Sequence, residues 1–251
     1  MSGHSKWSTI KRAKELKDSK RSKEITKSLK QIVSSVREGG TNPESNFLLK
    51  NAINKAKNLN ISNTSINNAI KKGSGEDKRY SDFETIFYEA YGPFGSIFLI
   101  ECFTNNKNRV ISDIRNVLEK NGGKLVDNGT INWQFELQFL ITLKFLDDNI
   151  ENVDKFNKIS DLDLIESYLF DIDGIIDYHI YEDAIYIYID PNKITQVKDF
   201  FYSNGVLIDE IEKKFVSKIP ISPSEEELVE IDNFIDILSG IDDIESVYSN
   251  I

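Results

Sequence analysis

The sequence predicts an α+β protein with an N-terminal three-helix bundle and two ferredoxin-like α/β domains, one inserted into the other. Three observations support this class. Residues up to about 75 carry three short helical patterns, and after Tyr80 the pattern changes to aromatic and β-branched runs. A helix, an Asn-Gly stop and a short apolar run ending in Asp then occur twice, over 113–127 and 196–209, which indicates two related α/β units.

The bundle is predicted from apolar residues that recur at helical spacing. The first helix covers Ser22 to Arg37 and is stopped by Gly39-Gly40. The second runs from about Asn46 to Asn60, and the third has Ser62 as its N-cap and Gly73 past its end. The side chains that these patterns turn inward are Ile25, Leu29, Ile32, Val33, Val36, Leu48, Leu49, Ala52, Ile53, Ala56, Leu59, Ile66, Ala69 and Ile70.

The remainder of the chain alternates strand and helix patterns. In order, the predicted elements are strands 85–91 and 97–103 joined by turn 92–95, helix 108–120, strand-like segments 124–126 and 131–135, strand 139–145, helix 162–169, strands 175–181 and 184–189, helix 193–203, extended segment 206–215, helix 224–238 with a capping box at Ser224, and strand 244–248. Residues 138–217 follow the ferredoxin-like order β-α-β-β-α-β. We therefore expect three domains: 1–80, 81–137 with 218–251, and an inserted domain of 138–217.

The charges are unevenly distributed along the 251 residues, whose formal net charge is −10. Residues 1–79 hold 18 Lys or Arg and 7 Asp or Glu, whereas residues 80–251 hold 13 and 34. A basic segment on an acidic body indicates a polyanion-binding module, although acidic residues can also simply keep the body soluble. The basic start has no apolar segment after it, and no apolar run reaches roughly 18 residues. We expect a cytoplasmic protein without a membrane partner.

Several short motifs in a fixed order resemble the YebC/PmpR family, to which the mitochondrial translational activator of cytochrome oxidase belongs. The motifs are Gly3-His4-Ser5-Lys6-Trp7, Ile10-Lys11, Lys20-Arg21, Arg37-x-Gly39-Gly40, Asn42-Pro43, Ala69-Ile70-Lys71-Lys72-Gly73, Tyr88-Glu89-Ala90-Tyr91-Gly92-Pro93, Asn105-Asn106-Lys107-Asn108-Arg109 and Asn121-Gly122-Gly123-Lys124-Leu125. The resemblance covers at least residues 3–135. The chain departs from the family pattern at Ser22, at Phe94 in the hairpin turn, where the family has Gly, and at Val110.

The resemblance implies a helical bundle with two α/β domains and a cytoplasmic nucleic-acid-binding protein. The family is traditionally described as transcriptional regulators, and some members act instead at the ribosome on stalled nascent chains. We therefore expect a DNA-binding regulator of transcription. The alternative is a ribosome-associated factor that binds ribosomal RNA and relieves stalled synthesis.

The basic start is expected to be an arm that orders on nucleic acid, since residues 1–30 hold 10 Lys or Arg and 3 Asp or Glu. Lys11, Lys14, Lys17 and Arg21 share one flank of a helical wheel. Trp7 can stack on bases, and packing against the protein is an equal alternative. The candidate nucleic-acid-binding residues are His4, Ser5, Lys6, Trp7, Lys11, Arg12, Lys14, Lys17, Lys20, Arg21, Lys23, Lys27 and Arg109. A helix N-terminal turn explains the Asn run before Arg109 equally well.

No catalytic group stands out, so we expect no enzymatic activity, cofactor, metal or small-molecule substrate. Two His and one Cys cannot build a Cys/His zinc site. We interpret His179 as a sheet residue, Cys102 as a structural thiol, and the clusters Glu225–Glu227 and Asp242-Asp243 as helix-capping or solvated groups. An enzyme on a ferredoxin-like scaffold and a protein-only adaptor remain alternatives.

Overall fold

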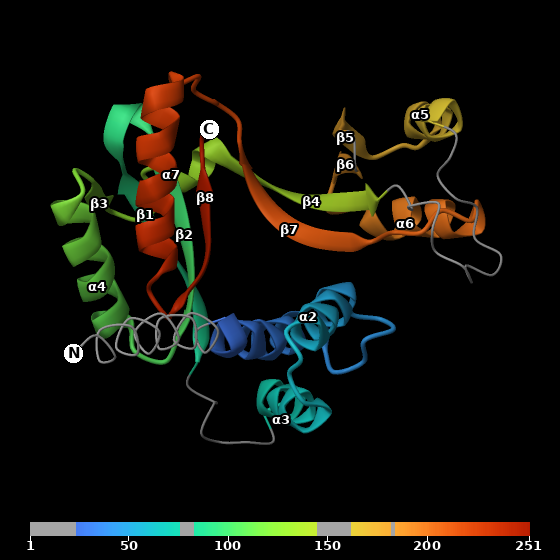
Figure 1. Ribbon diagram of the computed structural model, residues 1–251, viewed down its shortest axis with the longest axis horizontal. Helices are drawn as coiled ribbons and strands as arrows, with labels where there is room; N and C mark the ends of the chain where they lie inside the picture. Colours follow the sequence, from blue (N-terminus) through green and yellow to red (C-terminus); the bar gives the residue numbers. More distant parts are fainter. Residues whose placement is uncertain (1–23, 76–82, 145–161, 182–183) are drawn as a thin grey trace, which may run out of the picture. The chain divides into compact units, whose positions relative to one another are not determined.

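The computed structural model describes residues 24–75, 83–144, 162–181 and 184–251 (Figure 1). The chain divides into two compact units. The first comprises the described residues up to Ile131 with Ser222–Val247, and the second comprises Asn132–Ile221 with Tyr248–Ile251. Each sheet has four strands, in the orders β3-β1-β2-β8 and β5-β6-β4-β7. The predicted α+β class is confirmed.

Three helices of the first unit form the bundle: a helix over residues 24–39, α2 (Phe47–Asn58) and α3 (Asn63–Gly73). Their predicted apolar stripes meet in one core, because helical spacing places these side chains on one face of each helix. Phe103, from the neighbouring sheet, joins that core and connects it to the rest of the unit. The buried bundle residues are Ile32, Val33, Val36, Leu49, Ala52, Ala56, Ile61, Ile66 and Ala69.

The sequence predicts Gly73 just past the end of the third helix, and this prediction is wrong. Gly73 is the last residue of α3, and Ser74 is the C-cap. The glycine is required for packing, because a Cβ atom there would lie 2.6 Å from Val36 Cβ and 2.9 Å from the Val33 carbonyl oxygen. Close approach to the helix over 24–39, rather than helix termination, therefore explains this position.

Asn46 joins the start of α2 to the end of the preceding helix. It is 4% exposed, and its side chain accepts a hydrogen bond from Leu49 N (3.0 Å) as the N-cap of α2. Its amide nitrogen donates to the carbonyl oxygens of Ser35 (2.7 Å) and Gly40 (2.8 Å). One buried amide thus fixes the turn between two helices.

Replacing Asn46 with alanine is expected to lower the free energy of unfolding by about 2 kcal/mol, because the N-cap and two buried carbonyl partners are lost together. Urea unfolding of the full chain measures this change. Asn54→Ala is the matched control, since Asn54 is exposed in the middle of α2 and alanine is the better helix former. Equal effects of the two substitutions would contradict the assigned role of Asn46.

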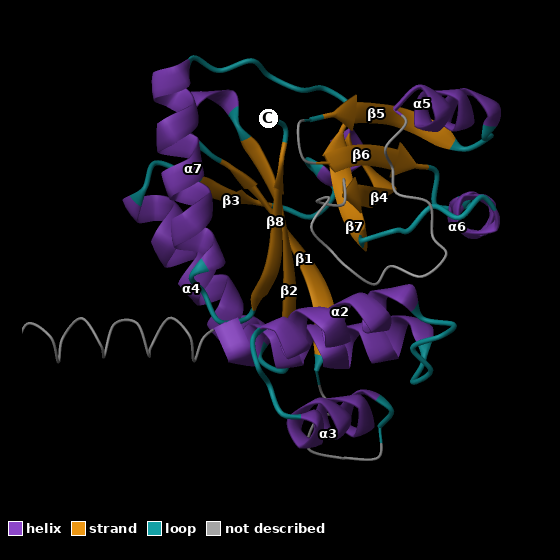
Figure 2. Ribbon diagram, turned by 45° about the vertical axis from the view of Figure 1, so that its right-hand side comes forward, coloured by secondary structure: helices purple, strands orange, loops and turns teal. Residues whose placement is uncertain are grey.

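The first sheet is covered by two helices on the same face (Figure 2). Its elements are β1 (Glu84–Tyr91), β2 (Ile97–Thr104), α4 (Lys107–Lys120), β3 (Lys124–Val126), α7 (Glu225–Ser239) and β8 (Ile244–Ser249). Phe98 and Ile100 of β2 pack against Ile114 of α4 and Phe234 of α7 in one buried cluster. The predicted capping box at Ser224 is confirmed.

One departure from the family pattern, Phe94, lies in the hairpin turn between β1 and β2. Phe94 has a φ of 55°, in the left-handed region that favours glycine. Gly92 is constrained differently, because a Cβ atom there would lie 2.2 Å from the buried ring of Phe98. The turn therefore needs glycine at Gly92 for space and carries a strained phenylalanine two residues later.

The second unit has the predicted ferredoxin-like element order. The elements are β4 (Phe135–Lys144), α5 (Leu162–Asp171), β5 (Ile175–Ile180), β6 (Ala184–Ile189), α6 (Ile194–Ser203) and β7 (Glu210–Ser217). Two boundaries differ from expectation. No strand covers 131–134, because Glu89 accepts a hydrogen bond from the amide of Ile131 and Asn132–Gln134 forms a 3-10 turn. The segment after α6 becomes a strand only at Glu210, since Val206 N still bonds to Phe201 O (2.8 Å).

Candidate nucleic-acid interface

The described part of the bundle keeps the basic character of the N-terminal region. Residues 24–75 contain eight Lys or Arg and three Glu. Two of the lysines, Lys55 and Lys57, occupy the last turn of α2, and Lys71 and Lys72 occupy the last turn of α3. Cations there stabilise the helix by offsetting the partial negative charge of its carbonyl end. These lysines therefore have a structural use within the bundle in addition to any role toward phosphate.

Only two of the predicted interface residues lie in the described ranges, Lys27 and Arg109. The others lie outside them: His4, Ser5, Lys6, Trp7, Lys11, Arg12, Lys14, Lys17, Lys20, Arg21 and Lys23. Lys27 is exposed on the helix over 24–39. Desolvation lowers the pKa of Lys27, while the nearby Glu245 carboxylate acts in the opposite direction.

Arg109 lies in the first turn of α4, where an asparagine sets the helix start. Asn106 is the N-cap of α4, and its side chain accepts a hydrogen bond from Arg109 N (3.0 Å). Thr104 Oγ1 in turn accepts from Asn106 N (3.0 Å). The Asn-rich motif before Arg109 thus begins a helix, which is the alternative interpretation of that motif.

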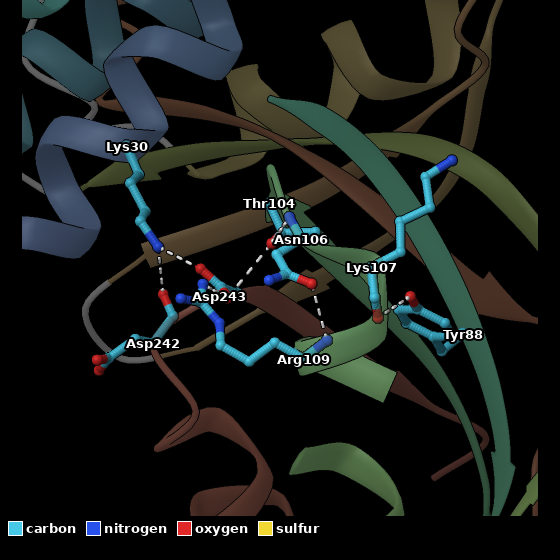
Figure 3. A network of polar contacts seen from close by, with 8 residues as sticks. All are labelled: Lys30, Tyr88, Thr104, Asn106, Lys107, Arg109, Asp242 and Asp243. Atoms are coloured by element: carbon cyan, nitrogen blue, oxygen red, sulfur yellow. Dashed lines mark hydrogen bonds and ion pairs between the residues drawn. The ribbon is translucent and has the colours of Figure 1, made fainter. Parts of the chain in front are cut away.

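Asp243 is the centre of the polar network around Arg109 (Figure 3). Its side chain is 4% exposed and accepts hydrogen bonds from Lys30 Nζ (2.7 Å) and Arg109 Nη2 (2.5 Å). Lys30 Nζ also donates to the Asp242 carbonyl oxygen (2.9 Å). The sequence predicts that Asp242 and Asp243 are solvated or helix-capping groups. For Asp243 this prediction is wrong, because two cations from distant segments hold its carboxylate in the interior.

The network has consistent effects on the ionisation of its members. Burial by itself would raise the pKa of Asp243, but hydrogen bonds and positive charge from Lys30 and Arg109 outweigh burial and hold the pKa below its ordinary value. The same hydrogen bond and charge raise the pKa of Arg109. Both partners are therefore stabilised in their charged forms.

A cleft of about 630 Å³ opens beside this network. Its lining combines cations and carboxylates, so it does not present a purely positive surface to a phosphate. Arg109, the candidate from the loop motif, already has a carboxylate partner there. The lining residues are Thr26, Lys30, Arg109, Asp113, Asn116, Val117, Gly240, Ile241, Asp242 and Asp243.

Sequence reasoning missed Lys30 and Asp243 as partners because they are 213 residues apart in the chain. It also missed Glu89, which is 2% exposed and accepts hydrogen bonds from the amides of Gly129 (2.6 Å) and Ile131 (2.5 Å). Its place between Tyr88 and Ala90, at the end of the apolar run of β1, was the available signal, since a charged residue among buried neighbours needs a partner.

The surroundings of Cys102 and His179 favour structural roles over chemical ones. Cys102 is fully buried in the sheet core, as predicted for a structural thiol, and burial raises its pKa. His179 is exposed on β5, 3.5 Å from the Asp177 carboxylate.

Within the described ranges, no group of three or more His, Cys, Asp or Glu is arranged to hold a metal ion. No helix in those ranges is both long and apolar enough to cross a bilayer.

Comparison with known proteins covers nearly the whole chain. Residues 5–76 match the family described as TACO1/YebC protein N-terminal domain, and residues 83–251 match TACO1/YebC second and third domain. A probable transcriptional regulatory protein of Chloroflexus aggregans is 37% identical over 252 residues, covering 100% of this chain and 95% of the relative. One from Corynebacterium urealyticum is 35% identical over 250 residues, covering 100% and 94%. The crystal structure of a conserved hypothetical protein of Aquifex aeolicus is similar with a TM-score of 0.74 and 28% identity, over 93% of this chain and 90% of that one.

Proposed function

Because the chain belongs to the TACO1/YebC family, we propose that it regulates gene expression by binding nucleic acid through its basic N-terminal segment. The observation that carries this proposal is the charge distribution, with 10 Lys or Arg against 3 Asp or Glu in residues 1–30 and a net charge of −10 for the whole chain. Release of counterions from phosphates favours binding by the basic segment, and the acidic remainder opposes binding elsewhere.

The contacts are assigned to Lys11, Lys14, Arg21 and the neighbouring basic residues, continuing to Lys27 on the described helix. Arg109 receives a different role. Its guanidinium bonds to the buried Asp243, and a phosphate would have to compete with that carboxylate. We therefore assign Arg109 a positioning role. Together with Lys30, on the helix over residues 24–39, it holds the Asp243 carboxylate in place.

Duplex DNA is the first candidate target, in keeping with the names of the relatives. Ribosomal RNA is the second. The exposed face of α3 carries Asn63, Thr64, Asn67, Asn68 and Lys71 and lacks arginine, whereas the commonest specific base contact in the major groove is a bidentate arginine on guanine. This favours contacts that do not depend on reading a DNA sequence. In either case we place the protein in the cytoplasm.

The test compares the full chain with a variant that combines Lys11→Gln, Lys14→Gln and Arg21→Gln. We expect its affinity for duplex DNA or purified ribosomes to fall about tenfold, and the slope of log affinity against log salt to decrease by about 2 to 3, because each phosphate contact contributes about 0.9 on duplex DNA and about 0.7 on single strands. Filter binding with promoter DNA and sedimentation with ribosomes are the two measurements, and they distinguish the two targets.

The matched control removes three exposed positive charges elsewhere in the first unit, Arg115→Gln, Lys120→Gln and Lys124→Gln. It changes the net charge equally and is expected to leave the salt slope unchanged. Equal losses in both triple variants, or no binding of the wild type to either target at low salt, would contradict the proposal.

A further inference from the structure

The sheet of the second unit has one face covered by helices. Ile185, Ile187 and Ile189 of β6 are fully buried on that face. Tyr178, which pairs with Ile187, packs edge-on against Phe170 of α5 with ring centroids 6.5 Å apart. Helices α5 and α6 lie on the same side of this sheet (Figure 2). The covered face is therefore the hydrophobic core of the unit.

The opposite face carries a different set of side chains, which the strand register fixes. Partners in an antiparallel pair point to the same face. One row across the four strands is His179, Tyr186, Thr142 and Glu210, and the next is Asp177, Tyr188, Leu140 and Glu212. We call these two rows, with the adjoining Tyr181, the tyrosine face. None of the helices described in this unit covers it.

The aromatic rings of the tyrosine face hold one another in place. Tyr181 and Tyr186 pack edge-on with centroids 5.6 Å apart, and His179 packs edge-on against Tyr188 at 6.0 Å. Tyr181 is 59% exposed. The face is exposed chiefly along its β5 edge, at Asp177, His179 and Tyr181, whereas Tyr186 and Tyr188 are half-buried and Leu140 and Thr142 are buried. A ligand would therefore meet Tyr181 and the β5 side chains beside it first.

Carboxylates flank these rings on both edges of the sheet. Asp177 lies on β5, and Glu210 and Glu212 lie on β7, where Lys214 Nζ lies 3.1 Å from Glu212. Residues 132–221 as a whole contain eighteen Asp or Glu and eight Lys or Arg. Desolvation, Tyr181 and the negative charge of Asp177 together raise the pKa of Tyr188. The face therefore combines aromatic rings with a negative field.

We propose that the tyrosine face binds a cationic, arginine-containing segment of a partner protein. Arginine stacks on tyrosine rings, and its guanidinium forms bidentate hydrogen bonds with carboxylates at the edges. A four-stranded open sheet with aromatic residues on its central strand is also how one class of modules stacks RNA bases. Here the phosphates of RNA would lie in the negative field of Asp177, Glu210 and Glu212, so charge favours the cationic protein segment.

The test uses the full chain and two fluorescein-labelled peptides of twelve residues, one alternating Arg with Gly and one alternating Lys with Gly. Fluorescence anisotropy is expected to show binding of the Arg peptide that is about threefold or more tighter than that of the Lys peptide, because stacking on tyrosine favours guanidinium. The variant Tyr181→Ala with Asp177→Asn is expected to weaken the Arg peptide about fivefold or more. The single variant Tyr181→Phe retains the ring and is expected to keep most of the wild-type affinity for the Arg peptide.

The matched control is Phe170→Ala with Asp171→Asn, which removes an exposed aromatic and an exposed carboxylate from the side of α5. It is expected to leave the affinity for the Arg peptide within about twofold of wild type. Equal affinities for the two peptides, or equal weakening by the two double variants, would overturn the proposal in favour of diffuse attraction. Binding of a twelve-nucleotide oligouridine that depends on Tyr181, without binding of the Arg peptide, would identify an RNA surface instead.

Discussion

Replacing Glu89 with alanine is expected to lower the free energy of unfolding of the first unit by about 3 kcal/mol, because two buried amides lose a charged acceptor. The carboxylate of Glu89 receives hydrogen bonds from the amides of Gly129 and Ile131. Alanine cannot accept these bonds, and the loop that precedes Asn132 loses its attachment to β1. Urea unfolding of the full chain measures the loss, and faster hydrogen exchange of the Ile131 amide localises it.

Glu84→Ala provides a control on the same strand. Glu84 is half exposed, and its carboxylate lies 2.9 Å from the exposed Lys107 Nζ. Exposed ion pairs of this kind contribute at most about 1 kcal/mol. Protection of the Ile131 amide is expected to survive in this variant. If Glu89→Ala had no larger effect than Glu84→Ala, Glu89 would not be the anchor of the loop.

Replacing Asp243 with asparagine is expected to lower the free energy of unfolding by about 3 kcal/mol at neutral pH, since breaking a buried ion pair leaves its partners without a counter-charge. Lys30 is 20% exposed and Arg109 is 53% exposed, so water compensates them in part. Asp242→Asn is the control, because its side chain is exposed and the carbonyl oxygen that accepts from Lys30 remains.

This difference between wild type and Asp243→Asn should depend on pH with a definite sign. The native pKa of Asp243 is held below its ordinary value of 3.8. The stabilisation is therefore fully present above that value and is lost as the pH falls through the native pKa. Urea unfolding across this range is the measurement. A difference that stayed constant down to the acid limit of folding would show that the charge of Asp243 contributes nothing.

Most of the fold was predictable because local spacing determines which residues are buried. Ile32, Val33 and Val36 recur at helical spacing and lie in the bundle core. Local patterns could not locate the start of β4, where a distant residue decides the structure. Ile131, Trp133 and Phe135 alternate with polar residues as in a strand, but the amide of Ile131 bonds to Glu89, 42 residues earlier, and the strand begins only at Phe135.

The candidate site was less predictable than the fold. Charge density identified a basic segment, and the residues at its centre lie outside the described ranges. The motif that ends at Arg109 predicts a nucleic-acid contact, but whether an arginine already has a carboxylate partner depends on tertiary contacts that the motif does not contain. Asp243 shows the same limit, because its sequence neighbourhood is acidic while the cations that neutralise it come from residues 30 and 109.

The discontinuity of the first unit has a consequence for its synthesis. Helix α7 and strand β8 supply Ile231, Phe234, Leu238 and Ile244 to the same core as β1, β2 and α4, yet they are translated after residues 132–221. Residues 132–221, which make up most of the second unit, emerge earlier as one continuous stretch. Chains lengthen at about 5–20 residues per second and domains fold as they emerge. The core formed by β1, β2 and α4 therefore keeps apolar surface uncovered until α7 and β8 have left the exit tunnel of the ribosome.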